Sequence, residues 1–236
     1  MTYLLLLYFS LFSFTTAPPD HQIEVTQLEE NVYLYESFAT YQGQLISANG
    51  LVLVSGNEVA LIDTPWDESQ TRQLLNWIDD KIDKPVAFAV ITHAHQDRIG
   101  GIDVLKTNHI PTVSGELTAT QAVQNGYAQP DASFQSDTLL TYGQASIDMF
   151  YPGPGHTVDN TVVYLNDRDI LYGGCFIKSA QAQSLGNLAD AYVQDWSQSL
   201  ARVKERYPER KLVIPGHGKW TPGAIENTLN LLLKAE

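Results

Sequence analysis

The sequence predicts an α/β protein made of two similar αβ halves with a functional site between them. Three observations support this prediction. Apolar runs of strand type alternate with amphipathic stretches of helix type along the chain. Pro- and Gly-rich turns follow several of the runs. Histidine or cysteine stands just after four of them. In open α/β proteins the functional residues lie at the carboxyl ends of the strands, so we expect the two halves to share one site.

The elements follow one another in a simple order. Alternating or continuous apolar runs predict strands at residues 31–38, 46–54, 58–62, 85–91, 146–151, 161–165, 170–172 and 212–214. Apolar residues at three- and four-residue spacing predict helices at residues 70–82, 118–125, 192–206 and 222–234. No linker, charge block or low-complexity stretch follows residue 20, so we expect residues 21–236 to form a single domain.

The first twenty residues differ from the rest. Residues 4–14 are continuously apolar and are followed by Thr15, Thr16 and Ala17, which is typical of a secretory signal peptide. The stretch is shorter than the roughly 20 apolar residues of a membrane span. No cysteine lies near the cleavage zone, so no lipid anchor is indicated. We expect residues 1–20 to direct the protein to the periplasm or outside the cell, with an N-terminal core strand as the alternative.

Composition narrows the classes of function. The chain has 236 residues, of which 44% are hydrophobic, so it can bury a large core. Its net charge of −13 argues against nucleic acid as a partner, because neutralising phosphates needs clustered Lys and Arg. Separately from this, we expect a small-molecule substrate, no membrane anchor and a monomeric protein.

A short segment carries three metal-binding side chains within five residues, namely His93, His95 and Asp97. Imidazole nitrogens suit zinc, and a carboxylate two residues later can reach a second cation. On an extended backbone, positions i and i+2 point the same way, so His93 and His95 can bind one ion together. The apolar run before them predicts a buried strand that ends at this loop. An isolated His-x-His also fits a plain polar loop, so the remaining ligands decide between the two.

Three further candidates repeat this arrangement. His156 and His217 stand in Pro- and Gly-rich turns after strand-like runs. Cys175, the only cysteine of the chain, follows another such run and a Gly-Gly turn. A lone loop histidine is more often structural than a ligand. Here a side chain of a metal-ligand type follows each of four predicted strands. This repetition favours a metal site over coincidence.

Six donors are too many for one tetrahedral zinc ion, because catalytic zinc usually keeps three protein ligands and an open position. Ligand chemistry suggests two sets of three, which is a hypothesis at this point: His93, His95 and His156 for one ion, and Asp97, Cys175 and His217 for the other. Two zinc ions about 3.5–4 Å apart can share a bridging hydroxide whose pKa falls toward about 7. We therefore expect two Zn²⁺ per chain and a hydroxide nucleophile at neutral pH.

In this order the six residues resemble the metallo-β-lactamase superfamily, and specifically the class B β-lactamases of subclass B1. The resemblance covers residues 23–233 and includes the segments at residues 61–66, 151–157, 173–178 and 186–191. It implies a four-layer α/β/β/α sandwich, the metallo-β-lactamase fold. It also implies zinc-dependent hydrolysis of the β-lactam amide bond of penicillins, cephalosporins and carbapenems, and hence antibiotic resistance.

The same resemblance implies roles for residues around the metal ions. Asp97, Lys178 and Asn187 would form the catalytic set, with Lys178 pairing with the substrate carboxylate and Asn187 helping to hold the carbonyl oxygen. The alternatives are an ordinary solvated lysine and, for Asn187, plain turn chemistry.

Four more residues would surround the site. Asp63 would support the ligand loop from behind, and Arg98 would tune the charge beneath the second ion. Trp66 and Tyr41, the latter in the hairpin tip at residues 41–43, would form an apolar wall over the substrate. For the aromatic residues the alternative is core packing, and for Asp63 it is a purely structural role.

Two other functions stay open. A thioester or lactone hydrolase of the same fold is one, although Arg98 after Asp97, and Cys175 in place of a bridging aspartate, both point away from it. A zinc-storing or zinc-sensing protein with a closed site is the other. The serine β-lactamase mechanism is excluded, because the chain contains no Ser-x-x-Lys.

Overall fold

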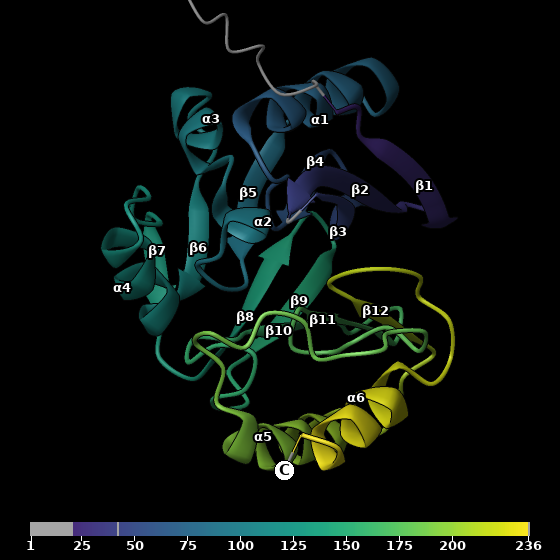
Figure 1. Ribbon diagram of the computed structural model, residues 1–236. Coiled ribbons are helices and arrows are strands. Elements are labelled where there is room, and N and C mark those ends of the chain that lie inside the picture. The colour runs from purple at the N-terminus through teal and green to yellow at the C-terminus, as the bar shows by residue number, and fades with distance from the viewer. Residues whose placement is uncertain (1–20, 42, 236) are drawn as a thin grey trace, which may run out of the picture.

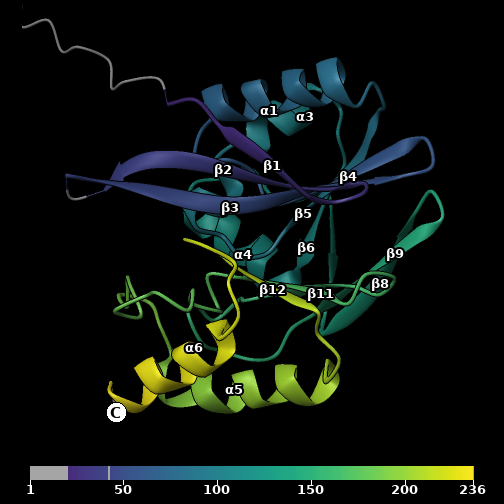
Figure 2. The ribbon, with the colours of Figure 1, turned by 90° about the vertical axis from the view of Figure 1, so that its right-hand side faces the viewer.

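Two sheets lie face to face at the centre of the molecule, and helices cover the outer face of each (Figure 1). The computed structural model describes residues 21–41 and 43–235. The four layers are therefore helix, sheet, sheet and helix, as Figure 2 shows from the side. This confirms the expected α/β/β/α sandwich.

The first sheet contains seven strands in chain order. They are β1 (Glu24–Glu29), β2 (Val32–Tyr41), β3 (Gln44–Ser55), β4 (Glu58–Ile62), β5 (Val86–Ile91), β6 (Thr112–Gly115) and β7 (Ala132–Phe134). Strands β1 to β4 pair antiparallel, and β4 to β7 pair parallel. Strands β2 and β3 form a long hairpin that projects beyond the sandwich (Figure 2).

The second sheet has the order β12-β11-β10-β9-β8. Its strands are β8 (Asp137–Tyr142), β9 (Ala145–Phe150), β10 (Val162–Leu165), β11 (Ile170–Gly174) and β12 (Leu212–Pro215). The β11–β12 pair is parallel and the other pairs are antiparallel. The helices are α1 (Glu68–Lys81), α2 (Gln96–Ile99), α3 (Ile102–Thr107), α4 (Glu116–Gln124), α5 (Val193–Arg206) and α6 (Ala224–Leu233).

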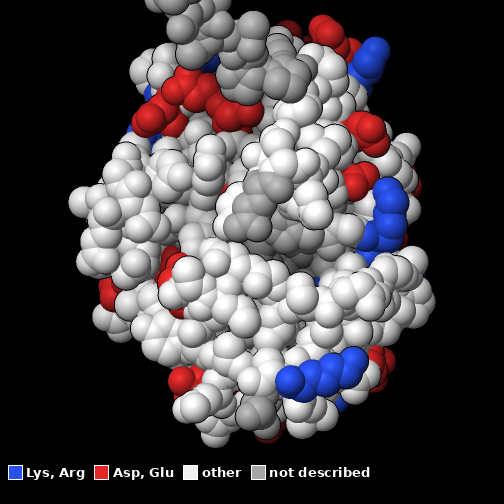
Figure 3. Space-filling model, in the orientation of Figure 1, with Lys and Arg blue, Asp and Glu red and all other residues white. Residues whose placement is uncertain are grey.

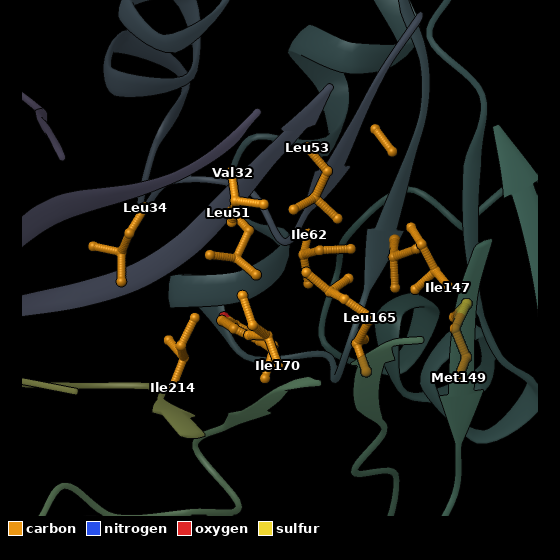
Figure 4. Packing of buried hydrophobic residues seen from close by; sticks show 14 of the residues in the cluster. Val32, Leu34, Leu51, Leu53, Ile62, Ile147, Met149, Leu165, Ile170 and Ile214 are labelled. Carbon is orange, nitrogen blue, oxygen red and sulfur yellow. The ribbon is translucent and has the colours of Figure 1, made fainter. Parts of the chain in front are cut away.

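The main core lies between the sheets. Side chains from β2, β3 and β4 meet side chains from β9, β10, β11 and β12, as Figure 4 shows for Leu51 and Ile62 on one side and Ile170 and Met149 on the other. Two further apolar clusters attach the helices: Leu74 and neighbours of α1 pack on the first sheet, and Trp196 with its neighbours packs α5 and α6 on the second. The buried faces therefore match the alternating patterns in the sequence.

Helix α1 is fixed to the long hairpin by polar contacts as well. The Asp67 side chain caps the helix by accepting the Gln70 backbone N–H at 2.8 Å. The Gln70 amide then exchanges two hydrogen bonds with the Phe38 backbone on β2, at 2.7 and 2.9 Å. These bonds attach the start of α1 to strand β2 of the hairpin.

The predicted elements agree with the structure to within a few residues, but four strands were missed. β1 has no buried residue and β8 has one, and β6 and β7 are only 4 and 3 residues long. The predicted ligand loop also contains the one-turn helix α2, which begins at Gln96. Short or edge elements bury too little apolar surface to leave a clear pattern.

Within the described residues, no helix combines the length and the apolar character needed to span a membrane. The predicted signal peptide at residues 1–20 lies outside the described residues.

The core between the sheets makes one testable prediction. Leu51 is completely buried there, with 0% exposure. We expect Leu51→Ala to lower the free energy of unfolding by about 2–5 kcal/mol, because it removes buried methyl groups and leaves a cavity. Chemical denaturation with an unchanged m-value would measure this. A loss below about 1 kcal/mol would contradict the assignment of Leu51 to a closely packed core.

Candidate metal centre

Four strand ends of the two sheets converge on one site. His93 and His95 follow β5, His156 follows β9, Cys175 follows β11 and His217 follows β12. Asp97 lies on the one-turn helix α2, for which His95 is the N-cap residue with extended backbone angles. The sandwich therefore brings together, at one edge, all six residues that the sequence singled out as candidate ligands.

Three imidazoles form the first cluster. The ring centroids of His93, His95 and His156 lie 4.8–5.1 Å apart, and the rings meet edge to face. One ring nitrogen of each lies within 4.8 Å of the others. His93 Nε2 is buried and has no hydrogen-bond partner. A buried nitrogen without a partner is costly, and a metal ion among the three rings would satisfy it.

The protonation of these rings suits metal binding. Burial holds the pKa of His93 well below its usual range, and the neighbouring His95 acts in the same direction. Burial, followed by the Lys178 ammonium, also holds the pKa of His156 well below that range. Both imidazoles are therefore neutral at pH 7, which is the form that binds a metal ion.

The second cluster combines an acid, a thiol and an imidazole. Cys175 Sγ lies 3.3 Å from Asp97 Oδ2 and 3.2 Å from His217 Nε2. His217 Nε2 is also 3.2 Å from Asp97 Oδ2, which closes the triangle. His93 lies beside this cluster, because one of its ring nitrogens is within 4.8 Å of ligand atoms of Asp97 and Cys175. The two clusters are thus adjacent.

A backbone carbonyl determines which His217 nitrogen faces the cluster. His217 Nδ1 lies 2.6 Å from the Ser47 carbonyl oxygen, so Nδ1 donates to it and Nε2 faces Cys175 and Asp97. The preceding residue, Gly216, must lack a side chain, since a Cβ there would lie 2.5 Å from the Cys175 backbone nitrogen. Asn49 holds the same turn through hydrogen bonds of 2.8 Å to the Pro215 and Gly218 carbonyls.

Arg98 lies beneath the second cluster and is completely buried. Its Nη2 donates to Cys175 Sγ at 3.1 Å and to the Gly216 carbonyl at 2.7 Å, and it lies 2.9 Å from Asp97 Oδ2. Burial alone would raise the pKa of Asp97, but Arg98 and the hydrogen bond with His217 hold it well below its usual range. Asp97 is therefore a carboxylate at neutral pH.

Asp63 is buried behind the first ligand loop. Its carboxylate accepts hydrogen bonds from the Thr92 backbone N–H at 2.8 Å and from Tyr172 Oη at 2.7 Å. Burial raises its pKa to about 6, against the opposing effect of Arg98. Its backbone is left-handed, with φ of 65°, which is a strained conformation for a residue other than glycine. Asp63 thus holds Thr92, the residue that precedes His93. This position is consistent with the supporting role that the resemblance implies for Asp63.

Lys178 is buried, with 8% of its surface exposed, and lies near the imidazole cluster. Its Nζ lies 5.2 Å from the centroid of the Trp196 ring, and the Trp196 and His156 ring centroids are 5.9 Å apart with the rings tilted by 50°. Burial lowers the pKa of Lys178, opposed by Cys175 and Asp97. Among the described residues, no acidic side chain lies within ion-pair distance of Lys178. A buried ammonium without an acidic partner can accept an anion from outside.

The remaining predicted site residues lie on the rim. Trp66 is half-buried, with its ring centroid 6.4 Å from that of His217. Tyr41 is exposed at the end of β2, and Asn187 is exposed in the loop before α5, where its side chain accepts the Ala189 backbone N–H at 3.1 Å. The hairpin and this loop project on the same side of the molecule (Figure 2). No contact between Tyr41 or Asn187 and the clusters is seen in the described residues.

Two acids at the site were not predicted. Asp159 is buried and accepts the Ala94 backbone N–H at 2.9 Å, which fixes the turn between His93 and His95. Asp190 Oδ2 lies 2.7 Å from His95 Nε2. Asp159 is close to His156 in the sequence and Asp190 belongs to a segment with family resemblance, but nothing in their local pattern indicates which histidine segment they contact.

The donor set fits zinc. The first cluster offers three imidazoles, and the second offers a carboxylate, a sulfur and an imidazole, which are the ligand types that zinc prefers. The site is also open on one side, because the His95 and His217 side chains are 22% and 34% exposed. A cavity of about 360 Å³ adjoins His95. An open position suits catalysis better than metal storage.

Comparison with known proteins gives an independent result. Residues 44–217 match the family model described as "Metallo-beta-lactamase superfamily". The chain is 44% identical over 211 residues to proteins named "Metallo-beta-lactamase type 2" from Bacillus sp. (strain 170) and Bacillus cereus, covering 89% of this chain and 82% of each relative. A solved metallo-beta-lactamase from Pontibacter korlensis superposes with a TM-score of 0.88 at 39% identity, covering 90% of this chain and 99% of that one. The resemblance drawn from the sequence is thus confirmed.

The second cluster makes a prediction about metal content. We expect Cys175→Ser to weaken the second site far more than the first, because a hydroxyl is a harder and less acidic ligand than a thiol. Elemental analysis after dialysis against limiting zinc should then give about one ion per chain for the variant and two for the parent protein. Two ions in the variant would show that Cys175 is not a ligand.

The charge state of His217 makes a second prediction. Burial opposes protonation of His217, but Cys175 and the hydrogen bond with Asp97 raise its pKa to about 9 in the metal-free protein. Because only neutral imidazole binds metal, an ion entering this cluster at pH 7 must displace the proton, and affinity should rise with pH up to about 9. Calorimetric titration with zinc in buffers of different ionisation enthalpy should show release of at least one proton per chain. Uptake without proton release would contradict the assignment.

Proposed function

Because the chain belongs to the metallo-β-lactamase superfamily, we propose that it hydrolyses the amide bond of β-lactam antibiotics and so confers resistance to them. The observation that supports this most strongly is the pair of adjacent three-donor clusters at the shared edge of two sheets. Penicillins, cephalosporins and carbapenems are the proposed substrates. All of them carry a carboxylate close to the lactam ring.

The proposed cofactor is two zinc ions, one in each cluster. When bound, they would supply Lewis-acid activation of the lactam carbonyl and a hydroxide nucleophile near neutral pH. The protein provides neutral imidazoles at His93 and His156 and a permanent carboxylate at Asp97. These three ligands are therefore already in the metal-binding protonation state at pH 7, whereas His217 must first lose a proton.

The proposed role of Lys178 is to bind the substrate carboxylate. It is a buried cation without an acidic partner among the described residues, and it lies close enough to the imidazoles to lower the pKa of His156. In the view of Figure 3, Lys and Arg side chains lie toward the edges of the described surface rather than at its centre. An anionic substrate would therefore be drawn to Lys178 rather than to a broad basic surface.

Other residues are assigned by position. Asn187 would donate its amide to the carbonyl oxygen of the substrate, and Trp66 and Tyr41 would line the apolar side of the opening. Asp63 and Arg98 would hold the ligand segments rigid through the hydrogen bonds described above. We further propose that residues 1–20 are a signal peptide for export to the periplasm and that the mature protein, residues 21–236, is one monomeric domain.

A direct assay tests the function. Purified protein should hydrolyse a chromogenic cephalosporin and a carbapenem, lose this activity with a chelator, and regain it with added zinc. S-lactoylglutathione serves as the thioester control. Turnover of the thioester alone would replace the proposal with a thioester hydrolase, and turnover that resists the chelator would exclude a role for the metal centre.

The substrate contact of Lys178 is tested separately. We expect Lys178→Ala to raise KM about ten- to a hundredfold with a smaller change in kcat, because a hydrogen bond to a charged group is worth about 1.5–3 kcal/mol. Lys178→Arg, which keeps the charge, should recover part of the loss. Steady-state kinetics with several β-lactams measures both. An unchanged KM in Lys178→Ala would remove Lys178 from the substrate site.

A further inference from the structure

The loop between Leu185 and α5 is held to the protein at few points. Leu185 is buried at 4% exposure, whereas residues 186–190 are all exposed. The hydrogen bonds that shape this loop are local: the Gly186 N–H donates to Ser184 Oγ at 3.3 Å, and the Ala189 N–H donates to Asn187 Oδ1 at 3.1 Å. These bonds give the loop a shape but do not attach it to the sandwich.

The cavity beside His95 lies beneath the end of this loop. Residues 189–192 line the cavity together with Ala94, His95, Gln121 and Asn125 of other segments. Ala191, at the end of the loop, packs against the apolar cluster around Trp196, whereas residues 186–190 are exposed. The cavity that Asp190 lines has a volume of about 360 Å³. Apolar packing therefore holds the end of the loop at Ala191 but does not fix residues 186–190.

One side chain crosses from the loop to the metal centre. Asp190 Oδ2 lies 2.7 Å from His95 Nε2, a distance typical of a charge-assisted hydrogen bond. The next attachment along the chain is the Tyr192 N–H, which donates to the Gly155 carbonyl at 2.7 Å. Among the described residues, no other side chain of residues 186–190 makes a hydrogen bond or ion pair with a distant segment. The position of the loop therefore depends on Asp190.

The same bond selects the tautomer of His95. A carboxylate accepts hydrogen bonds, so His95 Nε2 carries the hydrogen and Nδ1 keeps the lone pair. His93 offers the opposite nitrogen, because its Nε2 is the buried atom without a partner. The two histidines of the segment thus present different ring nitrogens to the first cluster.

We propose that Asp190 is a positioning residue that ties the substrate-side loop to the metal ligand His95, so that metal binding and loop placement are coupled. The proposal rests on the proposed function, in which His95 is a ligand and the loop carries Asn187. Coupling of this kind is reciprocal: metal bound at the first cluster stabilises the docked loop, and the docked loop strengthens metal binding by the same factor.

Asp190→Ala tests both sides of the coupling. Competition with a chromophoric chelator should show zinc affinity about 10- to 100-fold lower than in the parent protein. Hydrogen–deuterium exchange of residues 186–192 should slow on zinc addition in the parent protein and should not respond in Asp190→Ala. Asp190→Glu, which keeps the carboxylate, should recover part of both effects. Asp195→Asn is the matched control, because Asp195 is an exposed acid five residues further on with no hydrogen bond to a candidate ligand.

Zinc affinity in Asp190→Ala within twofold of the parent protein, or zinc-dependent protection of residues 186–192 that persists in this variant, would overturn the proposal. An equal loss of zinc affinity in Asp195→Asn would overturn the proposal as well. The loss would then result from the change in net charge and not from the contact between Asp190 and His95. These readouts need no substrate. If the parent protein hydrolysed no β-lactam, the proposed function would fail while the affinity and exchange comparison would still decide the role of Asp190.

Discussion

The buried guanidinium of Arg98 is the interaction on which the rest of the metal centre depends. It reaches Asp97 on its own helix, Cys175 after β11, and the carbonyls of Gly216 after β12 and Asn49 on β3. One side chain thus joins both sheets directly beneath the second cluster. A buried cation is tolerated only when its partners are fixed, so the two sheets, the acid and the sulfur must take up their positions together.

This arrangement gives the two clusters different acid–base character. In the first, burial keeps the imidazoles of His93 and His156 neutral, so neither has to lose a proton before a metal ion enters. In the second, Arg98 keeps Asp97 ionised, while the surrounding negative groups raise the pKa of His217 to about 9. The proton on His217 would therefore link metal binding at the second cluster to pH, which the neutral His93 and His156 do not do at the first. This difference in protonation arises from burial and from neighbouring charges, because both clusters contain histidine.

Much of this could be predicted from the sequence, and the failures have a physical pattern. Buried strands such as β4 and β5 could be predicted because they contain continuous apolar runs. The six candidate ligands could be predicted because they are polar residues that follow such runs closely. Asp190 and Asp159 could not be predicted in this way, because their roles arise from contacts with the segment at His93–His95, 65 or more positions earlier in the chain. Strand β8 was missed because only one of its six residues is buried. The local residue pattern indicates which positions are buried and where the chain turns. It does not indicate which distant segments come into contact.

The central claim is that two metal ions lie side by side between the sheets. Diffraction from zinc-soaked crystals, recorded at the zinc absorption edge, tests it most directly. The account predicts two anomalous peaks about 3.5–4 Å apart, one within the triangle of His93, His95 and His156 and the other within that of Asp97, Cys175 and His217. A single peak at full zinc saturation, or a second peak away from Cys175 and His217, would contradict it.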